Sequence, residues 1–362
     1  MKRNILYIFL FLMVALSGCE TYYVPDIDDV SGVLVVEGML TDQNDFTQIK
    51  LTRSVSFNKQ SYYYPEHKAT VSIESESGLS YPASETGSGV YKTKDPVPTE
   101  VGEGYYVRIV TSAGDEYRSE IEKMMSYTPI DSIYLSDSIF RDVSYDYWGN
   151  PVVSDYGGIT FSIIPHENPG EEVGYLYKWN ALVNYYVRAF KDGTDFNYYC
   201  WKQLSSDQIY VYEYVKDDYI NELPISDIHS LSFQRLSPLP IDSSRFEAPI
   251  AEVYSTSFYY HLRQYAISKD ASKFWRTVKN QSEATGKLFD AVEERIEGNI
   301  YCFSDSSKVA YGCFNAASFT DKVIGVQIVG NSHQGVKTFS MMPDSPKEEE
   351  DCYEWVSPDF WY

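Results

Sequence analysis

Short alternating segments separated by glycine-containing turns constrain the fold of the first third of this chain most strongly. The segments 48–53 and 70–74 alternate apolar with polar residues, which is the two-residue period of a half-buried strand. Turns such as Gly102-Glu103-Gly104 separate them, because glycine adopts backbone conformations that other residues avoid. A series of about seven such strands predicts an immunoglobulin-like β-sandwich over residues 31–126.

Longer strand-like segments begin after Pro129. Proline favours extended geometry in the residue before it, so Thr128-Pro129 marks a junction between two domains, and the chain is longer than one hydrophobic core usually serves. We expect residues 127–342 to form a larger antiparallel β domain. Its predicted strands are 158–164, 174–182, 185–190, 208–214, 228–236 and 251–267, the last with Phe258, Tyr260 and Leu262 on one face.

One α-helix is predicted at 269–285, directly after the last of these strands. Ser268 suits the N-cap position, and Gly286 suits the C-terminal exit. Apolar residues recur at i, i+3, i+4 and i+7, a stripe that should pack on the sheet. The stripe consists of Ala271, Phe274, Trp275 and Val278.

The first 18 residues have the pattern of a lipoprotein signal peptide. Lys2 and Arg3 precede an apolar run from Ile5 to Leu16, which is too short to span a bilayer because a spanning helix needs about 20 residues. The run ends in Leu-Ser-Gly-Cys, similar to the bacterial lipobox. We therefore expect a lipid on Cys19, an acidic tether over 19–30, and an outer-membrane protein on the cell-surface or the periplasmic face.

The net charge and the cysteine count limit which partners and which cellular compartment we expect for this chain. A net charge of −22 repels nucleic-acid phosphates, so we expect no nucleic-acid partner. Four cysteines remain once Cys19 is lipidated, and an even count in an oxidising compartment predicts disulfides. The pairing among them stays open, although Cys302 and Cys313 flank a turn that a hairpin would close. The four are Cys200, Cys302, Cys313 and Cys352, and no Cys-x-x-Cys spacing supports a metal or cofactor.

No local signature of catalysis is present in the sequence. The histidines, at 67, 166, 229, 261 and 333, are scattered, and neither a His-Glu-x-x-His motif nor a Gly-x-Ser-x-Gly elbow occurs. Asp192-Gly193 is typical of a hairpin turn rather than a calcium loop. We therefore predict no catalytic residues. The alternative is an extracytoplasmic hydrolase with dispersed catalytic groups.

Several motifs occur in a fixed order along nearly the whole mature chain. They include Leu34-Val35-Val36-Glu37-Gly38, Pro129-Ile130-Asp131-Ser132-Ile133, Tyr199-Cys200-Trp201, Arg263-Gln264-Tyr265-Ala266-Ile267-Ser268, Tyr311-Gly312 and Pro358-Asp359-Phe360-Trp361. In this combination the chain resembles domain-of-unknown-function family 4249, envelope lipoproteins of the Bacteroidota. The resemblance implies an envelope protein, often encoded beside a TonB-dependent outer-membrane receptor, and it supplies no catalytic residues.

The expected function is thus a lipid-anchored, non-catalytic binding or accessory protein with that receptor as its partner. The frequent aromatic side chains would suit a glycan or peptide ligand. The C-terminal tail, 343–362, has two expected fates. It either docks Phe360 and Trp361 on its own sheet or presents them to a partner.

Overall fold

The computed structural model describes residues 31–43, 45–55, 63–165, 173–205, 209–213, 223–229, 250–283, 296, 298–329, 332–339 and 352–354. The predicted signal peptide, Cys19, the tether and the aromatic end of the C-terminal tail lie outside these described residues. In the part of the chain that is described, no helix is both long and apolar enough to cross a membrane.

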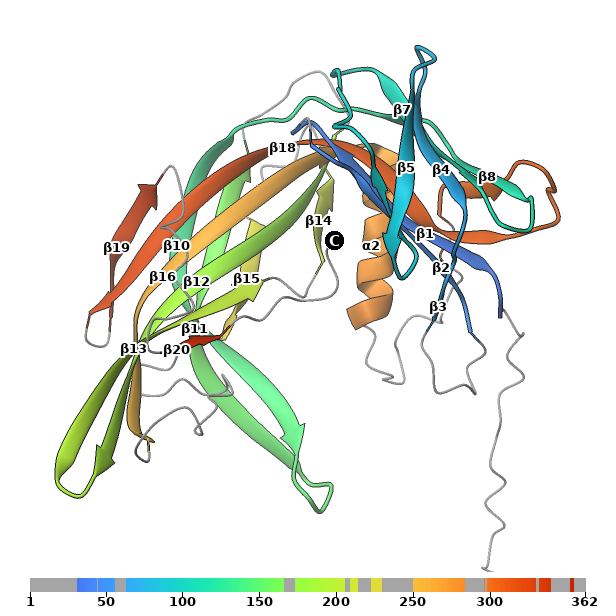
Figure 1. Cartoon of the computed structure of the whole chain (residues 1–362). Coiled ribbons are helices and arrows are strands. Elements are labelled where there is room, and N and C mark those ends of the chain that lie inside the picture. The colour runs from blue at the N-terminus through green and yellow to red at the C-terminus, as the bar shows by residue number, and fades with distance from the viewer. Residues whose placement is uncertain are drawn as a thin grey trace, which may run out of the picture.

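The predicted fold class is confirmed. The chain is mainly β, with a sandwich built on the N-terminal strands, a larger curled antiparallel sheet and one packed helix (Figure 1). The first group of strands is β1 (Leu34–Thr41), β2 (Gln48–Arg53), β3 (Tyr64–Pro65), β4 (Thr70–Ser75), β5 (Ser80–Gly87), β6 (Val90–Thr93), β7 (Gly104–Val110), β8 (Glu116–Ser119) and β9 (Glu122–Lys123).

The later strands form the large sheet, a separate three-stranded sheet, and two additions to the sandwich. They are β10 (Ile130–Tyr145), β11 (Pro151–Pro165), β12 (Gly174–Lys191), β13 (Thr194–Ser205), β14 (Tyr210–Glu213), β15 (Leu223–His229), β16 (Ile250–Ile267), β17 (Ile300–Cys302), β18 (Ala310–Val329), β19 (Ser332–Phe339) and β20 (Cys352–Glu354).

The sandwich core includes residues from far along the chain. Strand β17 pairs with β8, and β18 lies parallel to β1, with Leu34 opposite Ala310. Phe314 of β18 is fully buried among the side chains of β1, β2, β4 and β7. The predicted division places 300–316 in the second domain, whereas the core of the sandwich includes Ile300, Cys302, Ala310, Phe314 and Ala316 from this range. Residues 31–126 therefore lack part of the core that they surround.

Strand β18 also joins the large sheet, so it connects the two halves of the molecule (Figure 1). In that sheet β12 lies between β13 and β16, and β16 lies between β12 and β18. The two strands predicted at 174–182 and 185–190 are one strand, β12, with a register shift between Asn184 and Tyr185. The predicted alternation of β16 is confirmed, because Tyr260 and Leu262 are buried.

Two local predictions on this sheet and beside it are also confirmed. Asp192 and Gly193, both with positive φ, connect β12 and β13 in a two-residue hairpin, as expected for Asp-Gly. Helix α2 (Lys269–Glu283) begins after Ser268, whose Oγ accepts a hydrogen bond of 3.1 Å from the Ala271 amide. That bond satisfies one of the free N–H groups at the helix start.

The packing of α2 on the sheet depends on a glycine. A side chain at Gly174 of β12 would collide with Ser272, which is fully buried in the helix. Ala271 packs beside it, against Leu176 and Ile267 of the sheet. The helix thus lies closer to β12 than any larger residue at position 174 would allow.

The predicted junction is packed against the large sheet rather than free. The Thr128 hydroxyl donates a hydrogen bond of 3.0 Å to the Tyr175 hydroxyl, and Gln264 Nε2 donates one of 2.8 Å to the Thr128 carbonyl. The Tyr177 hydroxyl completes the group by donating to Gln264 Oε1 at 2.8 Å. Buried networks of this kind fix one relative arrangement of the elements that they join.

Candidate functional site

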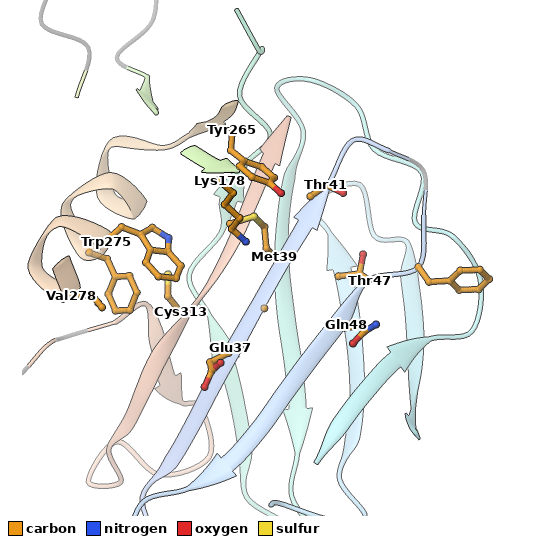
Figure 2. Close-up of a pocket in the computed structure, with 13 residues that line it drawn as sticks. Glu37, Met39, Thr41, Thr47, Gln48, Lys178, Tyr265, Trp275, Val278 and Cys313 are labelled. Atoms are coloured by element: carbon orange, nitrogen blue, oxygen red, sulfur yellow. The ribbon is translucent and has the colours of Figure 1, made fainter. Parts of the chain in front are cut away.

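A cavity of about 400 Å³ lies between the outer face of β1 and helix α2 (Figure 2). Alternation along β1 creates its floor, because Val36 and Leu40 face the sandwich core while Glu37, Met39 and Thr41 face the cavity. Ligand sites in proteins typically enclose about 300–1,000 Å³. We refer to this space as the β1–α2 cavity.

One wall of the β1–α2 cavity is aromatic and apolar. Helix α2 contributes Phe274, Trp275 and Val278, and the rings of Phe274 and Trp275 meet edge to face with centroids 5.5 Å apart. The stripe predicted for this helix therefore has two uses. Ala271 is buried against the sheet, Trp275 and Val278 pack against the same core and also line the cavity, and Phe274 lines the cavity.

The polar groups of the lining include one acid and one base. Lys178 of β12 directs its amine into the cavity near Tyr265, whose ring centroid is 5.3 Å from the Lys178 Nζ (Figure 2). Glu37 is at the other end of the lining and its side chain is 54% exposed. Its Oε2 lies 3.9 Å from Lys50 Nζ, a separation at which an exposed ion pair contributes little.

The amine of Lys178 is unusual in its electrostatics. Burial, together with the smaller effect of the positive charge of Arg263, its neighbour across the β12–β16 pair, lowers its pKa to about 7. Arg263 is itself fixed, because its Nε donates to Asp321 Oδ1 at 2.7 Å. A negative group placed in the cavity would favour the charged form of Lys178, since an opposite charge raises the pKa of an amine.

The structure separates the cysteines that the sequence grouped together. Cys302 and Cys313 are buried free thiols. They are not brought together as hairpin partners, because Cys302 pairs with Tyr117 of β8 and Cys313 with Glu37 of β1. Cys313 borders the β1–α2 cavity, but burial raises the pKa of its thiol well above the ordinary value. A thiol in that state is a poor nucleophile.

Cys200 and Cys352 occupy a different place in the fold. Strands β13 and β20 run parallel, and these two residues are opposite each other in the register. They are the two members of the predicted cysteine set that the backbone places side by side.

The histidines are distributed over several surfaces. His67 pairs with Glu85 on the sandwich, and His261 Nε2 lies 3.3 Å from Asp321 Oδ2 on the large sheet. His229 and His333 lie on β15 and β19, and His166 falls outside the described residues. Within the described ranges, no group of three or more His, Cys, Asp or Glu side chains could hold a metal ion.

Comparison with known families identifies the chain. A family described as a domain of unknown function (DUF4249) matches residues 20–323. The chain belongs to the DUF4249 family. Comparisons with curated proteins and with solved structures find no match. For this DUF4249 protein, the β1–α2 cavity therefore has to be interpreted from its own chemistry.

Two features of the DUF4249 chain were not predicted from the sequence. Lys178 lies in the strand-like stretch Tyr-Leu-Tyr-Lys-Trp, where the alternation gives no sign that α2 and β1 will enclose it. The second is the tip of the β10–β11 hairpin, where Tyr147 and Trp148 are 93% and 80% exposed. Its signal was present in the sequence as Tyr-Trp-Gly-Asn, an aromatic pair followed by turn residues.

Proposed function

We propose that this protein is a lipid-anchored, non-catalytic binding protein of the cell envelope that works beside a TonB-dependent outer-membrane receptor. The β1–α2 cavity carries the binding part of the proposal. It combines an aromatic wall with polar groups that could orient a ligand, both of which occur in sites for small ligands. The lipobox-like Leu-Ser-Gly-Cys19 supports the anchor.

The hairpin tip supports a macromolecular partner for the same protein. Tyr147 and Trp148 stack edge to face with centroids 5.3 Å apart on a loop that Asp146 organises. Asp146 Oδ1 accepts hydrogen bonds from the amides of Trp148 at 2.9 Å and Asn150 at 2.8 Å. Exposed, preorganised Trp and Tyr residues are the kind that dominate protein–protein contacts. We assign the receptor contact to this tip.

The experiment is an isolation of the native lipoprotein from its own envelope in mild detergent, followed by mass spectrometry. We expect a TonB-dependent receptor to copurify with the wild type and to be lost with Tyr147→Ser/Trp148→Ser. A small molecule should be retained by the wild type and lost with Val278→Trp, which fills the cavity. Val101→Trp, at an exposed position of the sandwich, is the matched control.

One further variant and one assay complete the test. Cys19→Ala should remain unlipidated and leave the membrane fraction. Turnover of glycan or peptide substrates by the purified wild-type chain would contradict the proposal and favour the hydrolase alternative.

A further inference from the structure

We propose that the β1–α2 cavity binds a short peptide with free termini and an apolar C-terminal side chain. This inference rests on the proposed function, because it names the ligand class of the same cavity. Three features of the lining carry it: the amine of Lys178 at one end, which a negative group would charge, the carboxylate of Glu37 at the other, and aromatic rings between them.

The cation would hold the peptide carboxylate. Lys178 directs its amine into the cavity from the end at which Tyr265, Met39 and Thr41 lie (Figure 2). A charged donor and a carboxylate form hydrogen bonds stronger than neutral ones. Arg263, opposite Lys178 on the neighbouring strand, is itself bound to Asp321.

The anion would hold the peptide amine. Glu37 reaches the cavity from β1, its contact with Lys50 is long at 3.9 Å, and its side chain is 54% exposed. Glu37 and Met39 are two residues apart on one strand face, a step of about 7 Å. An extended dipeptide spans about the same length, so it can extend along the cavity floor from Glu37 to Met39, beside which Lys178 lies (Figure 2).

The aromatic wall selects the side chain. Phe274, Trp275 and Val278 lie on the helix side of the cavity, and Met39 lies on the floor. Met adapts to the shape of a ligand and interacts favourably with aromatic rings. A Phe or Leu side chain placed there would lose contact with water, which favours binding by the hydrophobic effect.

The test is isothermal titration of the full chain in detergent with the dipeptide Ala-Phe, N-acetyl-Ala-Phe and Ala-Phe amide. We expect acetylation or amidation each to weaken binding about tenfold, as for the loss of one charged hydrogen bond. The decisive result is non-additivity. Acetylation should have no further effect in Glu37→Gln, and amidation should have none in Lys178→Gln.

The controls separate folding, peptide chemistry and the proposed function. Lys308→Gln removes an exposed lysine that pairs with Asp115, so it should bind like the wild type. Glu37 is exposed enough that its replacement should not affect folding, which melting temperatures will verify. Equal binding of all three dipeptides, or none, overturns the peptide assignment. If the dipeptides fail this test but the receptor still copurifies, the proposed accessory role is retained and only the peptide assignment is lost.

Discussion

The carboxylate of Glu122 accepts a hydrogen bond of 2.7 Å from the hydroxyl of Ser268, the residue that caps helix α2. Its other oxygen accepts one of 3.0 Å from Asn299 Nδ2. Asn299 in turn donates to the carbonyl of Phe314 at 2.7 Å. A buried acid of the sandwich thus positions the start of the helix that forms the aromatic wall of the β1–α2 cavity.

This arrangement predicts a pH dependence of stability. Burial raises the pKa of Glu122 above its ordinary value of 4.5. The folded protein therefore binds more protons than the unfolded chain between the two pKa values, and stability should decrease as pH rises through that window. Glu122→Gln removes this titration, so the decrease should be absent. The melting temperature of the variant should therefore rise relative to that of the wild type between pH 4 and pH 8. Parallel curves would contradict the prediction.

Glu116 should behave in the opposite way. Hydrogen bonds from Arg108 first, and then from Arg118, lower its pKa to about 2. The folded protein binds fewer protons than the unfolded chain between pH 2 and the ordinary value of 4.5. Its stabilising contribution is complete above that window and is lost as pH falls through it. Glu116→Gln should reduce the melting temperature at pH 7 and make it depend less on pH below pH 4.5. The same pH dependence below 4.5 in the variant and the wild type would refute this.

The sandwich core should depend on a residue of β18. Phe314 is fully buried, and Phe314→Ala should cost about 3–5 kcal/mol, the usual range for such a truncation. Phe303 is 57% exposed and lies against the guanidinium of Arg118, so Phe303→Ala should cost less than about 1 kcal/mol. Urea denaturation of the two variants measures the difference, and equal losses would show that β18 is not part of this core.

The packing of β17 and β18 in the sandwich core predicts how the fragment 31–126 behaves alone. Residues 31–126 lack β17 and the first part of β18, which contribute Ile300, Phe314 and Ala316 to the core. We expect hydrogen exchange to find no protected strands in this fragment. Protection that equals that of the full chain would show that the sandwich folds without them.

The backbone register predicts the disulfide pairing that the sequence left open. Cys200 and Cys352 are partners in the parallel pair of β13 and β20. Neighbouring strands lie about 4.8 Å apart, which falls within the Cα separation of about 4.4–6.8 Å found in disulfides. Peptide mapping of the unreduced protein should find Cys200 joined to Cys352, with Cys302 and Cys313 as free thiols. A bond between Cys302 and Cys313, or four free thiols, would contradict this prediction.

The sequence predicted the features that depend on near neighbours. The buried face of β16, the Ser268 cap and the Asp192-Gly193 hairpin follow from alternation, capping and turn chemistry, and all three are present. The parallel pairing of β1 with β18 could not be predicted, because no local sequence pattern specifies the register of two strands so far apart in the chain. Lys178 was missed for the same reason, since the elements that enclose it come from distant segments.

Photo-crosslinking can show whether the β1–α2 cavity binds peptides. The probe is a dipeptide of alanine followed by benzoylphenylalanine, irradiated with the full chain, and mass spectrometry locates the attached residues. We predict attachment to β1 around Met39 and to α2 around Trp275 and Val278, with competition by unlabelled Ala-Phe and loss of attachment in Lys178→Gln. Attachment spread over the sandwich surface, or attachment that Ala-Phe does not reduce, would contradict the account.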